Sequence, residues 1–356
     1  MRRLLMCTAA QIALLTGMGY GQAGALVDLP KDPRTLLTAA APYHNFDSAD
    51  LKPWHLKASY QYYDSNGNPT GEGKWEYWWA SPKVHRSTWT RNNATRTEWL
   101  TADGRFSKQD GGSLRYFERN ISQTLLGSLP SETSSIFRRM KLELRMVSMG
   151  QMQLACVSAT PQLENKGKLE APPSEDSRVY CFNPSSLALR LISEDSLIYE
   201  YDQVVKTQER YLAKQVVIMN GNQKAFSVAI ETIDEITSED SSLVPPVDAT
   251  LVKVSARRQT DNKNESDITV GSLVKKTEPD YPLFAKIAHD QGTVVLAAVV
   301  GTDGRIHDLE AIASPSPLLA KSAEDAVKKW EYKPYLLNGN PVEVEIMVHV
   351  NFTLSR

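Results

Sequence analysis

Side chains that could carry out catalysis or bind a metal are scattered through this 356-residue sequence. The six histidines contain no His-x-x-x-His pair, and the three cysteines form no cluster of the kind that holds zinc. The sequence also lacks a G-x-S-x-G elbow, a phosphate-binding loop and a G-x-G-x-x-G motif after a predicted strand. We therefore expect no enzymatic activity, no metal and no cofactor.

Two cysteines are placed where they could form a disulfide. Cys156 and Cys181 lie in the strand-like runs MQLACVSA and SRVYCFNP. In an oxidising compartment such a pair predicts a disulfide that joins neighbouring strands, and two buried thiols are the alternative.

The first residues, 1–23, have the pattern of a secretory signal peptide. Two arginines precede an apolar stretch at Leu4–Met18, and the small residues Gly21 and Ala23 fit a cleavage site. An uncleaved membrane anchor is the alternative, although the apolar stretch is shorter than the roughly 20 residues that span a bilayer. The pattern predicts an exported protein.

Composition and charge narrow the class of protein. The length allows two domains, each with its own core. A net charge of −2 gives no general attraction to nucleic acid or to an anionic membrane. The seven tryptophans and fourteen tyrosines favour β-structure.

Residues 24–236 are predicted to form a β-rich first domain. A short helix is expected at 31–46, with Asp32 as its cap, and two alternating aromatic runs around the NGNPTG turn predict a β-hairpin. Further alternating runs continue it as an antiparallel meander, which we expect to form a curved sheet or half-barrel with helices. A helix is expected across the sheet at 131–145, capped by Ser131.

Six tryptophans of this domain could either pack in its core or line an apolar cavity for a ligand. They are Trp54, Trp75, Trp78, Trp79, Trp89 and Trp99.

Residues 237–272 turn polar and include Pro245-Pro246, which predicts a linker, the alternative being a mobile loop within one larger domain.

Residues 273–356 predict a small α+β domain with a three-stranded antiparallel sheet. A short helix ended by Gly292 precedes the apolar strand TVVLAAVVG, and Asp303-Gly304 predicts a tight turn into a second strand. A helix is expected to start at Ser316 and Pro317.

The last predicted strand, 342–354, has no later strand to cover it. An apolar face is expected for Val342, Val344, Ile346, Val348, Val350, Phe352 and Leu354, and a polar face for Glu343, Glu345, Met347, His349, Asn351 and Thr353. An exposed strand edge can accept a strand from a partner. The alternatives are a central strand and a strand paired across a homodimer.

Segment 273–356 resembles the C-terminal domain of TonB-family energy transducers. The resemblance rests on PDYP, GTVVLAAVVGTDGRI, SPSPLLAKSAEDAVKKWEYKP, NGNPV and VHVNF, in the order and spacing of that family. It implies a periplasmic domain whose sheet recruits a strand, the TonB box, from outer-membrane receptors or transporters. It also implies that Tyr281-Pro282 and the last strand form the contact region.

The rest of the chain departs from a TonB transducer. The N-terminal apolar run carries no histidine for a proton-driven motor, and a folded β-domain replaces the long proline-rich spacer. The run YWWASPKVHRSTW loosely resembles a strand end of LolA/LppX-like half-barrels, which carry lipoproteins. That resemblance implies a lipid or other hydrophobic ligand, with the second domain as a docking module.

Overall fold

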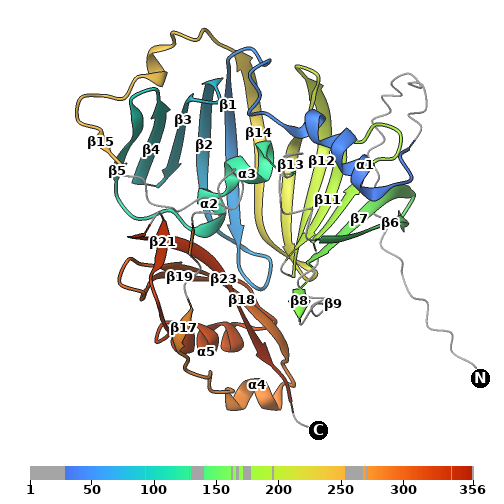
Figure 1. Cartoon of the computed structure of the whole chain (residues 1–356), viewed down its shortest axis with the longest axis vertical. Coiled ribbons are helices and arrows are strands. Elements are labelled where there is room, and N and C mark those ends of the chain that lie inside the picture. The colour runs from blue at the N-terminus through green and yellow to red at the C-terminus, as the bar shows by residue number, and fades with distance from the viewer. Residues whose placement is uncertain are drawn as a thin grey trace, which may run out of the picture.

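The computed structural model describes residues 29–92, 94–127, 129, 140–161, 163–165, 168–170, 178–194, 196–252, 268–269, 272–337 and 339–354. Its main feature is a 13-stranded curved sheet in the order β15-β5-β4-β3-β2-β1-β14-β13-β12-β11-β10-β7-β6 (Figure 1). The strands are β1 (Trp54–Tyr63), β2 (Pro69–Ser81), β3 (Val84–Arg91), β4 (Ala94–Thr101), β5 (Gly104–Asp110), β6 (Met140–Met149), β7 (Met152–Pro161), β10 (Arg178–Phe182), β11 (Leu189–Glu194), β12 (Leu197–Thr207), β13 (Arg210–Asn220), β14 (Gln223–Glu235) and β15 (Thr250–Leu251).

The predicted aromatic hairpin is confirmed as β1 and β2. These strands pair antiparallel, with Trp54 opposite Trp79 and Ala58 opposite Trp75. Alternate side chains point to one face of the sheet, so the period-two pattern buries one set of aromatic residues and leaves the other set on the opposite face. The expected fold class, a curved antiparallel sheet followed by a small α+β unit, is likewise confirmed.

Short helices cover one face of this sheet (Figure 1). They are α1 (Pro33–Ala40), the 3-10 turn η1 (Ala41–His44), α2 (Tyr116–Arg119) and α3 (Ile121–Leu126). Asp32 caps α1 by accepting a hydrogen bond from the Thr35 amide at 2.7 Å. Leu36 of α1 and Ile121 of α3 are fully buried in the same core as the sheet.

His44, at the end of η1, makes the first domain sensitive to acid. Its Nε2 lies 3.0 Å from the Leu187 carbonyl oxygen and 3.2 Å from the Leu189 amide nitrogen. Burial lowers the pKa of His44 from 6.5 to about 4. As the pH falls, His44 is protonated in the unfolded chain before it is protonated in the folded chain. The stability that its neutral form contributes above pH 6.5 is therefore lost between pH 6.5 and about 4.

We expect that loss to reach at most about 3 kcal/mol. Urea denaturation between pH 7.5 and 4 measures it. A His44→Leu variant should show a shallower fall over the same window. If the free energy of unfolding falls equally with pH in both proteins, His44 is not the source of the acid sensitivity.

The predicted helix at 131–145 is wrong where the structure describes it. Residues 140–149 form β6, because Met140, Leu142 and Leu144 alternate with charged residues and pack against the core. Residues 131–139 lie outside the described part of the chain. The helices that cross the sheet are instead α2 and α3, further upstream.

The six tryptophans are all buried, but on two faces. Trp54, Trp75, Trp79 and Trp89 belong to the main core. On the opposite face the Arg86 guanidinium lies 4.2 Å from the Trp78 ring and 5.5 Å from the Trp99 ring. These contacts are packing contacts, which is the first of the two alternatives given for the tryptophans.

Part of the predicted linker lies along the sheet. The 3-10 turn η4 (Ser241–Leu243) covers the outer face, where the Trp99 indole donates to the Ser242 carbonyl at 3.1 Å and Leu243 is buried. Strand β15 then pairs with β5. The aromatic outer face gives this polar segment a surface to bind.

On that same outer face a disulfide joins Cys156 of β7 to Cys181 of β10, which are directly opposite each other in the sheet. Both cysteines are buried there with Leu154.

The second domain is built around a three-stranded antiparallel sheet in the order β19-β18-β23. Its elements are β17 (Leu273–Lys275), α4 (Leu283–Ile287), β18 (Gly292–Val300), β19 (Ile306–Ala313), α5 (Pro317–Val327), β20 (Glu331–Tyr332), β21 (Tyr335–Leu337), β22 (Asn340–Val342) and β23 (Val344–Phe352). Two-residue β16 (Ile268–Thr269) pairs with β21, and the short β8 (Leu163–Asn165) and β9 (Lys168–Glu170) pair with each other. Helix α5 begins as predicted, with Ser316 as cap.

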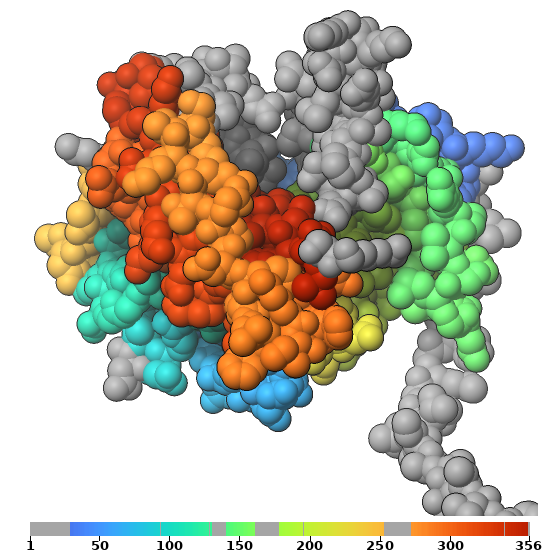
Figure 2. Space-filling model, turned by 90° about the horizontal axis from the view of Figure 1, so that it is seen from below, coloured from blue at the N-terminus to red at the C-terminus, as the bar shows by residue number. Residues whose placement is uncertain are grey.

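The two domains pack together. The second domain lies across one end of the curved sheet, below α2 and the lower ends of the central strands in Figure 1. Seen from that end in Figure 2, its orange and red residues lie in front of the blue, teal and yellow parts of the first domain. Val295 and Ile312 of the small sheet belong to the same buried cluster as the first domain's core.

Candidate partner-binding edge

Strand β23 is an edge strand. It pairs with β18 along its whole length, from Gly292 opposite Phe352 to Val300 opposite Val344. Among the described residues no strand pairs with its other edge. That edge presents a row of main-chain donors and acceptors that a second strand could satisfy.

The side chains predicted for the apolar face of this strand mostly pack inward. Val348, Val350 and Phe352 are buried against α5, in a cluster that Ile346 borders. These buried side chains are not available to a partner, whereas the main-chain groups of the open edge are.

Val342 does not belong to β23. The predicted continuous strand breaks at Glu343, and Val342 lies in β22 opposite Tyr335. It packs with Val300 in a small separate cluster that Val344 borders.

The face predicted to be polar is used differently from expectation. Met347 packs against the core of the first domain, and Glu345 pairs with Arg119 of α2. Only the later positions, His349, Asn351 and Thr353, are exposed as expected. Alternation alone cannot distinguish water from a second domain as the environment of that face.

Tyr281 and Pro282 lie beside the end of β23. The Tyr281 ring meets the Phe352 ring edge-on at a centroid distance of 5.3 Å, and its hydroxyl donates to the Asp290 carbonyl. Pro282 is the N-cap residue of α4. The structure therefore brings the Tyr-Pro pair next to the end of the last strand. Val342 lies in β22, away from this contact.

Sequence reasoning missed an exposed apolar patch on α4. Leu283, Phe284 and Ile287 are 67%, 73% and 66% exposed, and only Ala285 of this helix is buried. The signal was present in LFAKI, since its apolar residues lie on more than one side of the helix and a single packing surface cannot cover them all. Helix α4 also ends earlier than Gly292, with His289 in a left-handed conformation at φ 57°.

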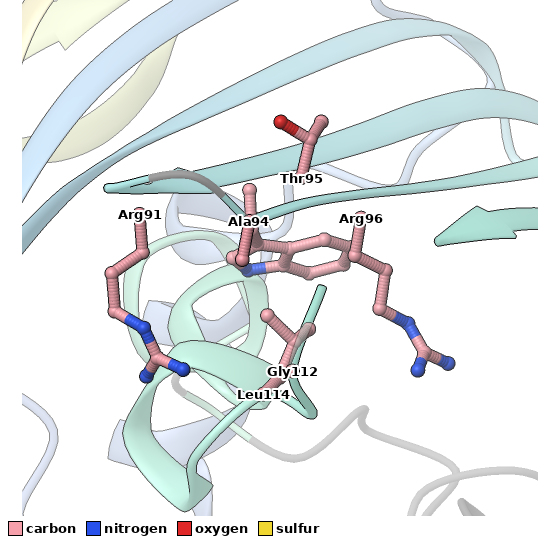
Figure 3. A pocket seen from close by; sticks show the side chains of 7 residues that line it. Arg91, Ala94, Thr95, Arg96, Gly112 and Leu114 are labelled. Atoms are coloured by element: carbon pink, nitrogen blue, oxygen red, sulfur yellow. The ribbon is translucent and has the colours of Figure 1, made fainter. Parts of the chain in front are cut away.

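A shallow pocket lies at the turn between β3 and β4 (Figure 3). Its two arginines already have partners. Arg91 binds Glu118 at 3.1 Å, and Arg96 binds Glu98 at 2.7 Å. The pocket therefore offers an anionic ligand no unpaired charge.

The described residues contain no group of three or more His, Cys, Asp or Glu residues arranged to hold a metal ion. None of their helices is long and apolar enough to cross a membrane.

The second domain is similar to a known family. Residues 277–354 match the family model described as the Gram-negative bacterial TonB protein C-terminal. The chain is 30% identical over 81 residues to the protein TonB of Vibrio cholerae, a match that covers 22% of this chain and 33% of that protein. The chain thus spans about a third of the curated relative that it matches.

Solved structures resemble each part of the chain. The solution structure of the Pseudomonas aeruginosa TonB C-terminal domain is 27% identical, with a TM-score of 0.21, over 26% of this chain and 94% of that one. A LolA superfamily protein from Nitrosomonas europaea is 6% identical, with a TM-score of 0.38, over 60% of this chain and 98% of that one. An outer membrane lipoprotein-sorting protein domain from Vibrio parahaemolyticus is 5% identical, with a TM-score of 0.38, over 59% of this chain and 94% of that one.

Proposed function

We propose that this chain is a periplasmic TonB-family protein that binds its partner by strand addition at the free edge of β23. The partner is an outer-membrane TonB-dependent receptor or transporter, or another envelope protein, and the interaction supports energy-coupled transport without covalent chemistry. The observation that carries the proposal is the unpaired edge of β23 among the described residues, on the segment that matches the TonB C-terminal family.

The position of the Tyr-Pro pair fits this role. Tyr281 packs on Phe352 near the end of β23, and the exposed side chains of α4 follow directly after Pro282. Main-chain hydrogen bonds along the edge supply affinity, and the α4 patch supplies a contact for an apolar side chain of the partner.

A second function is proposed from the first domain. Its concave face carries a large apolar interior that contains Tyr62, Phe117 and Phe226 under α2 and α3. We infer that this interior could hold a lipid or another hydrophobic molecule, with the second domain as the docking module. Native mass spectrometry of the purified chain tests it, and the absence of any co-purifying lipid would count against it.

Proline substitutions test strand addition. Successive residues of an antiparallel strand direct their N–H groups alternately toward the neighbour and away from it. Of Val348 and His349, one therefore faces β18 and the other faces the open edge. A proline at the inward position breaks the sheet, whereas a proline at the outward position removes only a bond to the partner.

We expect Val348→Pro and His349→Pro to differ in this way. The variant that keeps the wild-type melting temperature should bind receptor-derived peptides at least about tenfold more weakly, since one main-chain bond and its neighbours are lost. Isothermal titration with synthetic peptides from the periplasmic N-termini of TonB-dependent receptors measures this. Unchanged affinity in the stable variant would exclude β23 as the binding edge.

A further inference from the structure

Strand β18, at the centre of the second domain's sheet, is buried on both faces. Val294, Leu296 and Ala298 of β18 pack against α5 within the second domain. Their neighbours Val295 and Ala297 are equally buried, but in the cluster that contains the first domain's core. Strand β18 thus has one face in each domain.

Ion pairs surround this apolar contact. Arg115 and Arg119 of the α2 region bind three carboxylates on the second domain, and we call this set of five residues the arginine latch. Arg115 lies 2.9 Å from Glu310, and Arg119 lies 3.3 Å from Asp308 and 3.2 Å from Glu345. The Tyr116 amide also donates to Glu310 at 2.8 Å.

The latch closes over aromatic side chains of the first domain. The Arg115 guanidinium lies 3.9 Å from the centre of the Tyr62 ring, between that ring and Glu310. Tyr62 in turn meets Phe226 at 4.8 Å and Phe117 at 6.2 Å, measured between ring centroids. All three rings are at most 5% exposed.

The partly exposed ion pairs of the contact between the two domains are compatible with reversible opening. The Arg119 and Glu345 side chains keep 15% and 17% of their exposure, and the Arg115 side chain keeps 45%. Contacts between domains that mix partly hydrated ion pairs with modest apolar area resemble transient interfaces. Solvent can reach these charges, so opening does not leave a charge stranded in the protein interior.

We propose that the second domain is a lid over Tyr62, Phe117 and Phe226, held shut by the arginine latch, and that its opening admits a hydrophobic molecule to the first domain. Glu345 of the latch is on β23, so a strand that docks on this edge acts on the lid. The hydrophobic molecule rests on the second function proposed above, which native mass spectrometry tests separately, and only the coupling to β23 rests on the proposed strand addition.

Charge reversal in the full-length chain tests the lid. Arg119→Glu places a carboxylate against Asp308 and Glu345, and we expect it to raise the affinity for cis-parinaric acid, a fluorescent fatty acid, at least about tenfold. Adding Glu345→Arg to Arg119→Glu should return the affinity toward the wild-type value. The control is Arg145→Glu on β6, an exposed arginine whose partner is Glu143, and it should leave the affinity unchanged.

A milder variant protects the test against misfolding. Glu310→Gln removes one latch charge but keeps an acceptor for the Tyr116 amide, and we expect a gain of about threefold. Far-UV circular dichroism checks that each variant is folded. If folded Arg119→Glu and Glu310→Gln bind the probe no better than Arg145→Glu, or if Glu345→Arg does not reverse the gain, the lid is wrong. Failure of the proline test of β23 would leave this result unaffected.

Discussion

Replacement of Glu118 by alanine is expected to lower the free energy of unfolding by about 3–5 kcal/mol, because it leaves a partly buried arginine without its counter-charge. The Glu118 side chain is fully buried. It accepts hydrogen bonds from the Tyr60 hydroxyl at 2.7 Å, from Arg91 at 3.1 Å and from the Arg115 amide at 2.7 Å. All three donors lose this partner together.

Tyr60 takes part in this network as a donor. Burial, followed by the hydrogen bond to Glu118, raises the pKa of Tyr60 above its ordinary value. The hydroxyl is therefore protonated at neutral pH and donates to the carboxylate. Phenylalanine at this position should accordingly destabilise the fold by less than the Glu118 change, since it removes only one of the three donors.

Urea denaturation with matched variants measures the effect. Glu98→Ala is the control, because Glu98 pairs with Arg96 at 2.7 Å but both side chains keep about a quarter of their exposure. Surface pairs of this kind contribute at most about 1 kcal/mol. A Glu118→Ala loss no larger than the Glu98→Ala loss would show that the buried pair is not a main support of the first domain.

Gly304→Ala is expected to destabilise the second domain by at least about 3 kcal/mol. Gly304 has φ +79°, and a Cβ atom there would lie 2.0 Å from the Tyr332 carbonyl oxygen. The Gly304 carbonyl also accepts a hydrogen bond from the Tyr332 amide at 2.8 Å, so the two backbones cannot separate without losing it. The substitution must move the turn between β18 and β19.

Gly339→Ala is the matched control. Gly339 has nearly the same φ, +80°, but nothing lies within 4 Å of a Cβ atom built there. Its cost should be limited to the left-handed backbone, about 1–2 kcal/mol. Thermal denaturation followed by hydrogen exchange in β18 and β23 compares the two. Equal costs would mean that the contact with Tyr332 can relax.

Local patterns predicted the second domain better than the first. In the second domain each local signal agrees with the next: Asp303-Gly304 turns the chain, Ser316 caps α5, and the apolar run 293–300 is buried on both faces. The aromatic hairpin β1–β2 was equally plain, because its alternating residues fit only one pairing.

The errors have one physical source, which is that burial by distant segments is invisible in a local pattern. MKLELRM could be interpreted as helical until β7 supplied a partner strand for Met140–Met149. Residues 241–243 and 250–251 of the predicted linker lie along the sheet, because Trp99 offers η4 a partner on the outer face and β5 offers β15 a strand edge. Glu345 and Met347 were predicted to face water. Glu345 instead pairs with Arg119 of α2, and Met347 packs against the core of the first domain. Both contacts come from segments that are distant in the sequence.

The central claim is that the open edge of β23 binds a partner strand, and residue-resolved amide hydrogen exchange tests it most directly. The full-length chain is measured alone and with a saturating receptor-derived peptide. We predict that alternate amides of Val344–Phe352 gain protection, because only every second N–H faces the open edge. Saturating binding that protects only α4 or the first domain, with β23 unchanged, would contradict the account.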